Sequence, residues 1–109
     1  MGFSFSANSG RLLENLVYLR LRQQYKQVYY YQTKNNLEVD FYVPEKKLAI
    51  QASLSLDNEV IRNREVRSLV ELSKEIRGVR KIIVTEAEED VIKSKSGRIQ
   101  VTPLYRWLL

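Results

Sequence analysis

The chain has 109 residues, of which 44% are hydrophobic and 28% are charged, and its formal net charge is +5. This length and balance predict one compact domain over residues 1–109 and exclude a compositionally disordered chain. Because Cys and His are both absent, disulfides, thiolate or imidazole metal sites and Ser-His-Asp catalysis are excluded. No stretch approaches the roughly 18 apolar residues that span a bilayer, so we expect a cytoplasmic protein with no membrane partner.

The first predicted element is a helix. Asn8 and Ser9 are both good N-caps, and residues 11–22 have the apolar periodicity of a helix that ends near Tyr25. Glu14 falls at the border of the apolar arc, where its carboxylate can either point under a sheet or pair with a neighbouring arginine. The predicted arc comprises Leu12, Leu13, Leu16, Val17, Leu19 and Leu21.

Three antiparallel strands are predicted next, over residues 27–33, 37–43 and 48–54, because strand-forming residues alternate there with turn residues. The hairpin formed by the last two strands has the same register for a two-residue or a four-residue turn. Since side chains alternate along a strand, one face of this hairpin is apolar and the other is polar. The register sets Val43 opposite Leu48, Phe41 opposite Ile50, Asp40 opposite Gln51 and Glu38 opposite Ser53, with Val39 on the apolar face.

A long helix is predicted over residues 58–77, with Asp57 as its cap and Gly78 as the residue that stops it. Its apolar stripe is expected at Val66, Leu69, Val70, Ser73 and Ile76. The opposite face carries arginines that could contact phosphates, but interleaved glutamates indicate a solvated face with local ion pairs. The arginines are Arg62, Arg64 and Arg67, and the glutamates are Glu59, Glu65, Glu71 and Glu75.

The remaining elements complete a mixed sheet. Residues 80–85 form a continuous apolar run, which favours a central strand buried on both faces. The acidic residues 86–90 are expected to form a solvated loop or turn. A Ca²⁺ site is rejected there, because the spacing does not fit a Ca²⁺-binding loop. A hairpin of strands 91–93 and 98–102 should follow, and residues 104–109 are typical of a short apolar helix. The expected fold class is therefore α/β, with helices on opposite faces of the sheet.

This order matches the αβββαβ core of the PD-(D/E)XK nuclease superfamily. In that superfamily, an Asp on one strand and the acid of an acid-any-Lys triplet on the next hold a divalent metal, and the Lys positions the attacking water. Asp40 followed by Gln51-Ala52-Ser53 resembles this arrangement. More closely, nearly the whole chain is similar to the C-terminal domain of unassigned function in a large family of prokaryotic AAA-type ATPases. The motifs that carry this resemblance are Phe3-Ser4-Phe5, Gly10-Arg11-Leu12-Leu13-Glu14-Asn15-Leu16-Val17, Glu38-Val39-Asp40-Phe41, Ile50-Gln51-Ala52-Ser53-Leu54-Ser55-Leu56, Arg64-Glu65 and Pro103-Leu104-Tyr105-Arg106-Trp107-Leu108-Leu109.

The resemblance implies an ancestral site made of Glu14, Asp40, Gln51 and Ser53. Two of these four positions depart from the nuclease pattern. Glutamine offers a metal only a neutral carbonyl oxygen, and serine supplies no cation to polarise water. The resemblance also implies that the chain is the C-terminal part of a longer ATPase, and that ATP binds to the preceding domain, because no phosphate-binding loop is present here.

Three functions are consistent with these residues. The first is a catalytically degenerate domain that binds nucleic acid or a protein on behalf of the attached ATPase, and the net charge of +5 makes nucleic acid the leading partner. The second is a working nuclease in which Glu14, Glu38 and Asp40 hold Mg²⁺ and Lys34 replaces the missing lysine. The third is a structural or regulatory module that docks on the ATPase or on another subunit and binds no nucleic acid.

Several expectations follow from the first function. Mg²⁺ should bind weakly, if at all, at Asp40 and Glu38, and DNA should not be cut. Glu14, Asp40 and Gln51 should lie close together although they are distant in the sequence. The nucleic-acid contacts are expected at Lys34, Arg62, Arg64 and Arg67. Restoring the pattern with Gln51→Glu and Ser53→Lys should raise metal affinity if the site is a lapsed nuclease.

Overall fold

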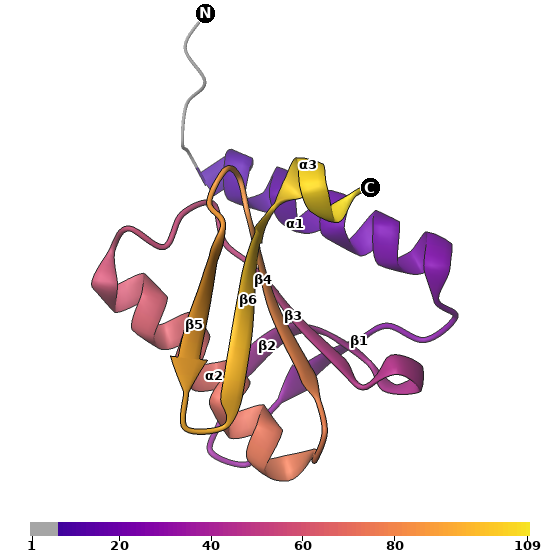
Figure 1. Cartoon of the computed structure of the whole chain (residues 1–109). Coiled ribbons are helices and arrows are strands. Elements are labelled where there is room, and N and C mark those ends of the chain that lie inside the picture. The colour runs from indigo at the N-terminus through magenta and orange to yellow at the C-terminus, as the bar shows by residue number, and fades with distance from the viewer. Residues whose placement is uncertain (1–6) are drawn as a thin grey trace, which may run out of the picture.

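The computed structural model describes residues 7–109, which form a six-stranded mixed sheet with helices on both faces (Figure 1). The predicted order of elements is confirmed, including the closing hairpin and the short last helix; the motif at residues 3–5 lies outside the described residues. No helix in the described part is long and apolar enough to cross a membrane. The elements are α1 (Ala7–Gln24), β1 (Tyr29–Gln32), β2 (Glu38–Val43), the 3-10 helix η1 (Pro44–Lys46), β3 (Leu48–Ala52), α2 (Glu59–Glu75), β4 (Arg80–Thr85), β5 (Asp90–Ser94), β6 (Gly97–Pro103) and α3 (Leu104–Trp107).

The strands are ordered β1-β2-β3-β4-β6-β5 across the sheet. The first three form the predicted antiparallel meander, and the predicted pairs Val43–Leu48 and Phe41–Ile50 are present. Helix α2 then carries the chain across one face, so that β4 lies parallel to β3, and β6 lies parallel to β4. Strand β4 is central as predicted, because it has a hydrogen-bonded neighbour on each side.

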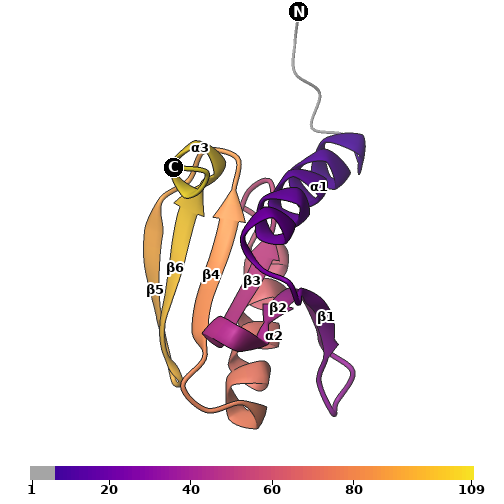
Figure 2. The ribbon, with the colours of Figure 1, turned by 90° about the vertical axis from the view of Figure 1, so that its right-hand side faces the viewer.

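The core has two layers, one on each face of the sheet. One layer joins Phe41, Val43 and Ile50 to α1, and the other joins Ala49 and Ile83 to α2. The two long helices therefore cover opposite faces, as predicted, which Figure 2 shows with α1 in front of β3 and α2 behind it.

Val39 departs from the predicted alternation. It packs in the α2 layer, whereas Phe41 and Val43 pack in the α1 layer. The physical reason is a bulge between β1 and β2, where the register shifts between the pairs Tyr29–Tyr42 and Tyr31–Val39. A bulge bends a strand and re-aims the side chains beside it. The bend in β2 therefore falls beside Asp40, the residue between Val39 and Phe41.

Helix α1 buries a narrower stripe than the periodicity predicts. Only Leu13, Val17 and Leu21 of the predicted arc are buried, because a straight helix on a sheet presents mainly one i, i+4 row to it. The other three leucines of the arc that were expected to face the core are exposed: Leu12 by 51%, Leu16 by 37% and Leu19 by 56%.

Helix α2 also differs at its ends from the prediction. Asn58, not Asp57, is the cap, and its side-chain oxygen accepts from the Ile61 amide at 3.1 Å. The helix ends at Glu75, and Gly78 adopts a φ of 74° in the turn that follows. The buried residues are Ser68, Leu69 and Leu72, with Val66, Val70 and Ile76 partly buried beside them.

Glu88 turns inward, although a solvated loop is predicted for residues 86–90. Its carboxylate accepts from the Ser55 hydroxyl at 2.6 Å and from the Leu56 amide at 2.8 Å. Its own amide donates to the Thr85 hydroxyl oxygen at 2.9 Å. This Glu88 clasp ties the segment between β3 and α2 to the loop between β4 and β5.

Candidate functional site

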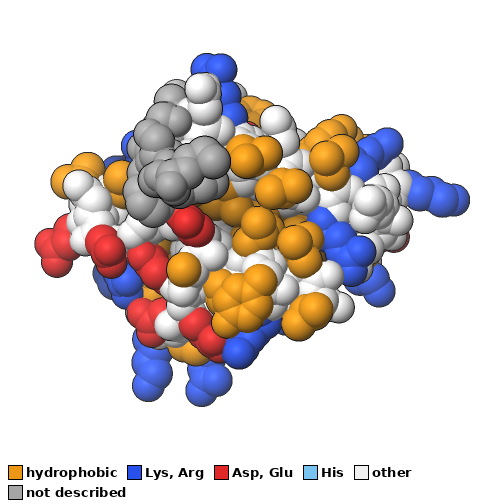
Figure 3. All heavy atoms as spheres, turned by 90° about the horizontal axis from the view of Figure 1, so that it is seen from above, with side chains coloured by type: hydrophobic (Ala, Val, Ile, Leu, Met, Phe, Trp, Pro, Cys, Tyr) orange, Lys and Arg blue, Asp and Glu red, His pale blue; other side chains and the backbone are white. Residues whose placement is uncertain are grey.

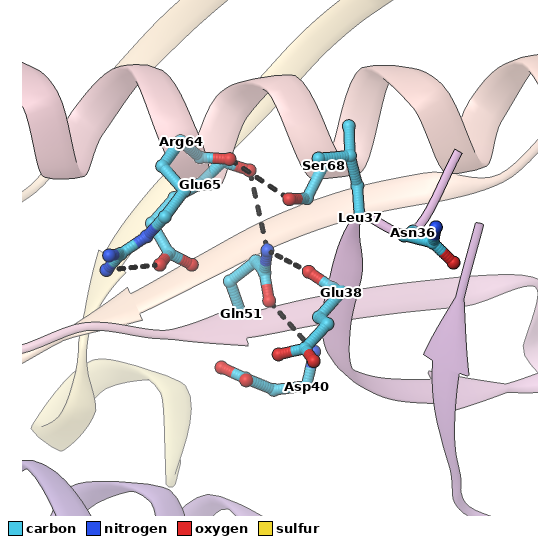
Figure 4. Close-up of a pocket in the computed structure, with 8 residues that line it drawn as sticks. All are labelled: Asn36, Leu37, Glu38, Asp40, Gln51, Arg64, Glu65 and Ser68. Carbon is cyan, nitrogen blue, oxygen red and sulfur yellow. Dashed lines mark hydrogen bonds and ion pairs between the residues drawn. The ribbon is translucent and has the colours of Figure 1, made fainter. Parts of the chain in front are cut away.

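The site begins where β2 and β3 stop pairing through their backbones. The last recorded backbone pair at this end is Phe41–Ile50, and beyond it the Gln51 side chain takes the place of the ladder. Its Oε1 accepts from the Asp40 amide at 2.8 Å, and its Nε2 donates to the Glu38 carbonyl at 3.2 Å (Figure 4). In the opposite direction, the Asp40 side chain binds the β3 backbone, because its Oδ2 accepts from the Ala52 amide at 2.8 Å. The structure thus brings Asp40 and Gln51 together, as the predicted register requires.

Gln51 is a buried residue with little spare hydrogen-bonding capacity. It is only 2% exposed, and its Nε2 also lies 3.5 Å from the Glu65 carbonyl oxygen on α2. Buried polar groups need partners, and a side-chain amide has two donors and one acceptor oxygen to satisfy them. The amide therefore holds β2, β3 and α2 together, a role that a carboxylate could not fill without a donor.

Two hollows meet at Arg64 and Glu65. The first has a volume of about 360 Å³ and lies between α2 and the ends of β2 and β3. The second has a volume of about 640 Å³ and contains Glu14 and Ser53. The first hollow is lined by Asn36, Leu37, Glu38, Asp40, Gln51, Arg64, Glu65 and Ser68.

Asp40 and Glu65 form a pair of partly buried carboxylic acids. Burial raises the pKa of Asp40 to about 6, while the Ala52 amide opposes the shift and the charge of Glu14 adds to it. Burial likewise raises the pKa of Glu65 to about 7, with the charge of Asp40 as the next cause. Because Glu14 acts on both carboxylates, the structure brings α1, β2 and α2 together around this pair.

Arg64 is the cation of the site. Its Nη2 lies 3.5 Å from Glu65 Oε1, and its charge lowers the pKa of both Asp40 and Glu65. The guanidinium is largely exposed, with 65% of the side chain accessible, whereas only 13% of the Glu65 side chain is accessible. The net charge of Glu14, Asp40, Glu65 and Arg64 depends on how many protons the two buried acids keep near neutral pH.

Glu65 is a site residue that the sequence prediction missed, since it was assigned to the solvated face of α2. A signal was present in the sequence. Glu65 precedes Ser68 by three residues and Leu69 by four, so it lies on the same helical stripe as the residues that α2 buries. An acid on a buried stripe indicates either a paired charge or a functional carboxyl group.

Two other predicted site residues, Ser53 and Lys34, do not line the first hollow with Asp40 and Gln51. Ser53, predicted opposite Glu38, lines the second hollow, because β2 and β3 diverge beyond Gln51. Lys34 lines neither hollow, and its amide donates to Glu75 at 2.9 Å.

The α2 arginines that were predicted to contact nucleic acid have different surroundings. Arg62 pairs with Asp90 at 3.6 Å, whereas Arg64 pairs with Glu65, and Arg67 is exposed. Among residues 7–109, no group of three or more Asp and Glu side chains is arranged to hold a metal ion. The two acids with raised pKa values and their cation are therefore Asp40, Glu65 and Arg64.

Residues 9–107 match a family model described as a domain of unknown function, DUF4143. The chain belongs to this family. This DUF4143 domain is also 34% identical over 116 residues to an uncharacterized protein, MJ1544, of Methanocaldococcus jannaschii. The match covers 97% of the chain and 26% of the relative, so the chain spans about a quarter of that protein's length. No solved structure matches the chain.

Proposed function

We propose that this DUF4143 domain is a nuclease-like accessory domain of a longer cytoplasmic AAA-type ATPase, and that it binds nucleic acid without cutting it. The order of elements and the acid-bearing hairpin support the nuclease-like part of this proposal. The greater length of the M. jannaschii relative supports a longer parent protein. The observation that carries the proposal is that the oxygen and the nitrogen of the Gln51 side-chain amide are both hydrogen-bonded to backbone groups of β2.

Metal-dependent hydrolysis needs charged oxygen ligands and a group that positions water. At the Gln51 position the oxygen is neutral and already accepts from an amide. At the Ser53 position the hydroxyl donates to the Ser55 carbonyl at 3.2 Å and carries no charge. Mg²⁺ at Asp40 and Glu38 would also compete with the proton that the raised pKa of Asp40 favours. These residues therefore argue against hydrolysis and favour a domain that binds nucleic acid without cutting it.

The first test is a cleavage assay. Plasmid and single-stranded DNA are incubated with the domain and Mg²⁺ or Mn²⁺, beside an Asp40→Ala variant purified in parallel to reveal contaminating nuclease. We expect no cutting by either protein. Cutting by the unmodified domain that disappears in Asp40→Ala would establish a working nuclease and contradict the proposal.

The second test is the salt dependence of DNA binding. Phosphate contacts release counterions, so affinity should fall steeply between about 50 and 200 mM salt. Fluorescence anisotropy with a labelled oligonucleotide measures this slope directly. If the domain does not bind DNA even at the lowest salt, the nucleic-acid part of the proposal is wrong.

Protein docking is a second candidate function, favoured by one face of the molecule. Hydrophobic side chains gather on the side formed by α1 and α3 (Figure 3). Among them, Leu12, Leu19 and Tyr105 are exposed by 51%, 56% and 64%. A hollow of about 100 Å³ beside them is lined mainly by apolar residues of α1, α3 and the segment after β3: Ser9, Leu12, Leu13, Leu16, Leu54, Glu86 and Leu104.

We propose that the attached ATPase domain covers this face, because exposed apolar patches are typical of interaction surfaces. Side-chain footprinting tests the idea. Leu12 and Leu19 should be labelled strongly in the isolated domain and weakly in the longer protein, whereas Val60, which is 75% exposed on α2, serves as the control. Equal labelling of the two leucines in both proteins would contradict it.

A further inference from the structure

One half of the sheet is open on the α1 side. Helix α1 covers β3 and its neighbours, and α3 lies over only one end of β4 and β6, as Figure 2 shows. At the other end of these strands, neither α1 nor α3 lies over the sheet in this view. The side chains there are solvent-exposed, including those of Arg80, Lys93 and Arg98.

These three basic side chains form a row across three neighbouring strands. Lys81 on β4 pairs with Ile99 on β6, so the preceding residues, Arg80 and Arg98, are also neighbours. Arg98 pairs directly with Lys93 on β5. Ile99 is buried in the α2 layer, and therefore its neighbour Arg98 points to the α1 side of the sheet. With strands about 4.8 Å apart, the row spans about 10 Å.

The charges of this basic row are not neutralised by the fold. Within residues 7–109, the four ion pairs involve Arg62, Arg64, Lys74 and Arg106, and none involves the basic row. Like charges on directly opposed residues of neighbouring strands destabilise a sheet. A polyanion that bound across the row would remove this repulsion.

The β5–β6 hairpin, which carries Lys93 and Arg98 of the row, is firmly held. Ile92 and Ile99 pack its inner face against the α2 layer, which leaves the outer face free. The buried Lys81 of β4 reaches the turn between β5 and β6, where its side-chain ammonium donates to the Ser96 carbonyl oxygen at 3.0 Å. Lys95, in the same turn, adds a further exposed charge. The hairpin is thus a supported two-stranded ribbon with a basic outer face.

We infer that the basic row binds the phosphates of double-stranded B-form DNA. This inference rests on the proposed nucleic-acid function and assigns it a surface other than the α2 arginines. A two-stranded ribbon fits the major groove of B-DNA, whereas the major groove of an A-form RNA duplex is too narrow.

Single strands are a poorer match, because their binding relies on aromatic platforms. In the described part of the chain, β4, β5 and β6 carry no aromatic residue. The exposed tyrosines lie on other elements: Tyr18 on α1, Tyr29 and Tyr30 on β1, and Tyr105 on α3. The recognition at the row is therefore of phosphates on a duplex.

The test compares two triple variants that each remove three positive charges. One is Arg80→Ala/Lys93→Ala/Arg98→Ala, and the matched control on α2 is Arg62→Ala/Arg64→Ala/Arg67→Ala. Anisotropy with a labelled DNA duplex is measured over a range of salt, after circular dichroism has shown that both variants keep the fold. Each lost phosphate contact should reduce the slope of log affinity against log salt by about 0.9, so the row variant should lose about two to three units of slope.

The row variant should also bind at least about tenfold more weakly, because phosphate contacts supply most of non-specific affinity. An equal or larger loss in the α2 variant would overturn this inference and leave the proposed function intact. Equal affinity for single-stranded DNA or an RNA duplex would overturn the choice of B-form DNA. Failure of the unmodified domain to bind any nucleic acid would overturn the proposed function, and this inference with it.

Discussion

Polar side chains are bound within the fold at one end of the sheet and exposed to solvent at the other. Around Gln51 and Asp40, side chains are buried and bound to the backbone of β2, β3 and α2. Around Arg80 and Arg98, side chains are exposed and bear no ion pair among the described residues. A buried polar group must be satisfied by the fold itself, whereas an exposed charge stays free for a partner. The end that carries Asp40 and Gln51 is therefore the less available one.

The largest expected effect comes from Gln51→Glu. The new carboxylate would face the Glu38 and Glu65 carbonyl oxygens with no donor to offer them. An uncompensated buried charge costs about 3–5 kcal/mol, so the free energy of unfolding in urea should fall by roughly that amount at neutral pH. Gln23→Glu, on the exposed side of α1, is the matched control and should change little.

A double variant that adds Ser53→Lys to Gln51→Glu tests whether the end of the sheet near Gln51 can bind a metal ion. If the end near Gln51 can still hold a cation, Mn²⁺ should raise the melting temperature of Gln51→Glu/Ser53→Lys and not that of the unmodified domain. The reason is that the variant puts a charged oxygen ligand where the neutral Gln51 amide now binds the Asp40 backbone. No metal-dependent shift in the double variant would show that these two changes do not create a metal site.

The next effect is the pH dependence of stability. The raised pKa values of Asp40 and Glu65 mean that the folded state binds more protons than the unfolded state at mildly acidic pH. The free energy of unfolding should therefore fall as the pH rises from about 5 to about 8, by about 2–3 kcal/mol in all. Urea titrations at several pH values measure this directly.

Asp40→Asn should flatten that profile. The asparagine oxygen can still accept from the Ala52 amide, but the buried negative charge is gone. At about pH 8 the variant should be more stable than the unmodified domain by about 1–2 kcal/mol. Glu45→Gln, at an exposed position in η1, should leave the profile unchanged. A variant profile as steep as the original would mean that Asp40 does not cause the dependence.

The smallest effect is expected from Arg64→Ala. Its ion pair with Glu65 joins a largely exposed guanidinium to the site, so the loss of stability at neutral pH should stay below about 1 kcal/mol. The pKa of Glu65 should nevertheless rise further, since Arg64 lowers it. A carboxyl-carbon NMR titration reports this pKa, with Arg67→Ala as the control. An unchanged or lower pKa in Arg64→Ala would contradict the assigned role.

Local patterns made much of this fold predictable. Alternation and turn length are properties of adjacent residues, and they were enough to pair Phe41 with Ile50 and to bring Asp40 beside Gln51. The continuous apolar run of β4 likewise predicted its central place. Periodicity, however, says only which residues share a face. It does not say whether anything covers that face, which is why Leu12 and Leu19 are exposed against the prediction.

The details of the site depend on several elements at once. The bend beside Asp40 arises from a register shift against β1, so the hairpin alone does not reveal it. The replacement of the β2–β3 ladder by Gln51 depends in turn on that bend. Glu65 was missed because its neighbours on α2 are charged, and only the packing of α2 on the sheet separates it from them.

The Glu88 clasp should determine which parts of the molecule unfold together. It joins the segment that leads into α2 to the loop that leads into the β5–β6 hairpin. Elements linked by buried hydrogen bonds tend to unfold together as one cooperative unit. The slowest-exchanging amide hydrogens of the β1–β3 meander and of the β5–β6 hairpin should therefore exchange only when the whole domain unfolds. Glu88→Ala should split that event in two, so that the hairpin exchanges first while the meander stays protected.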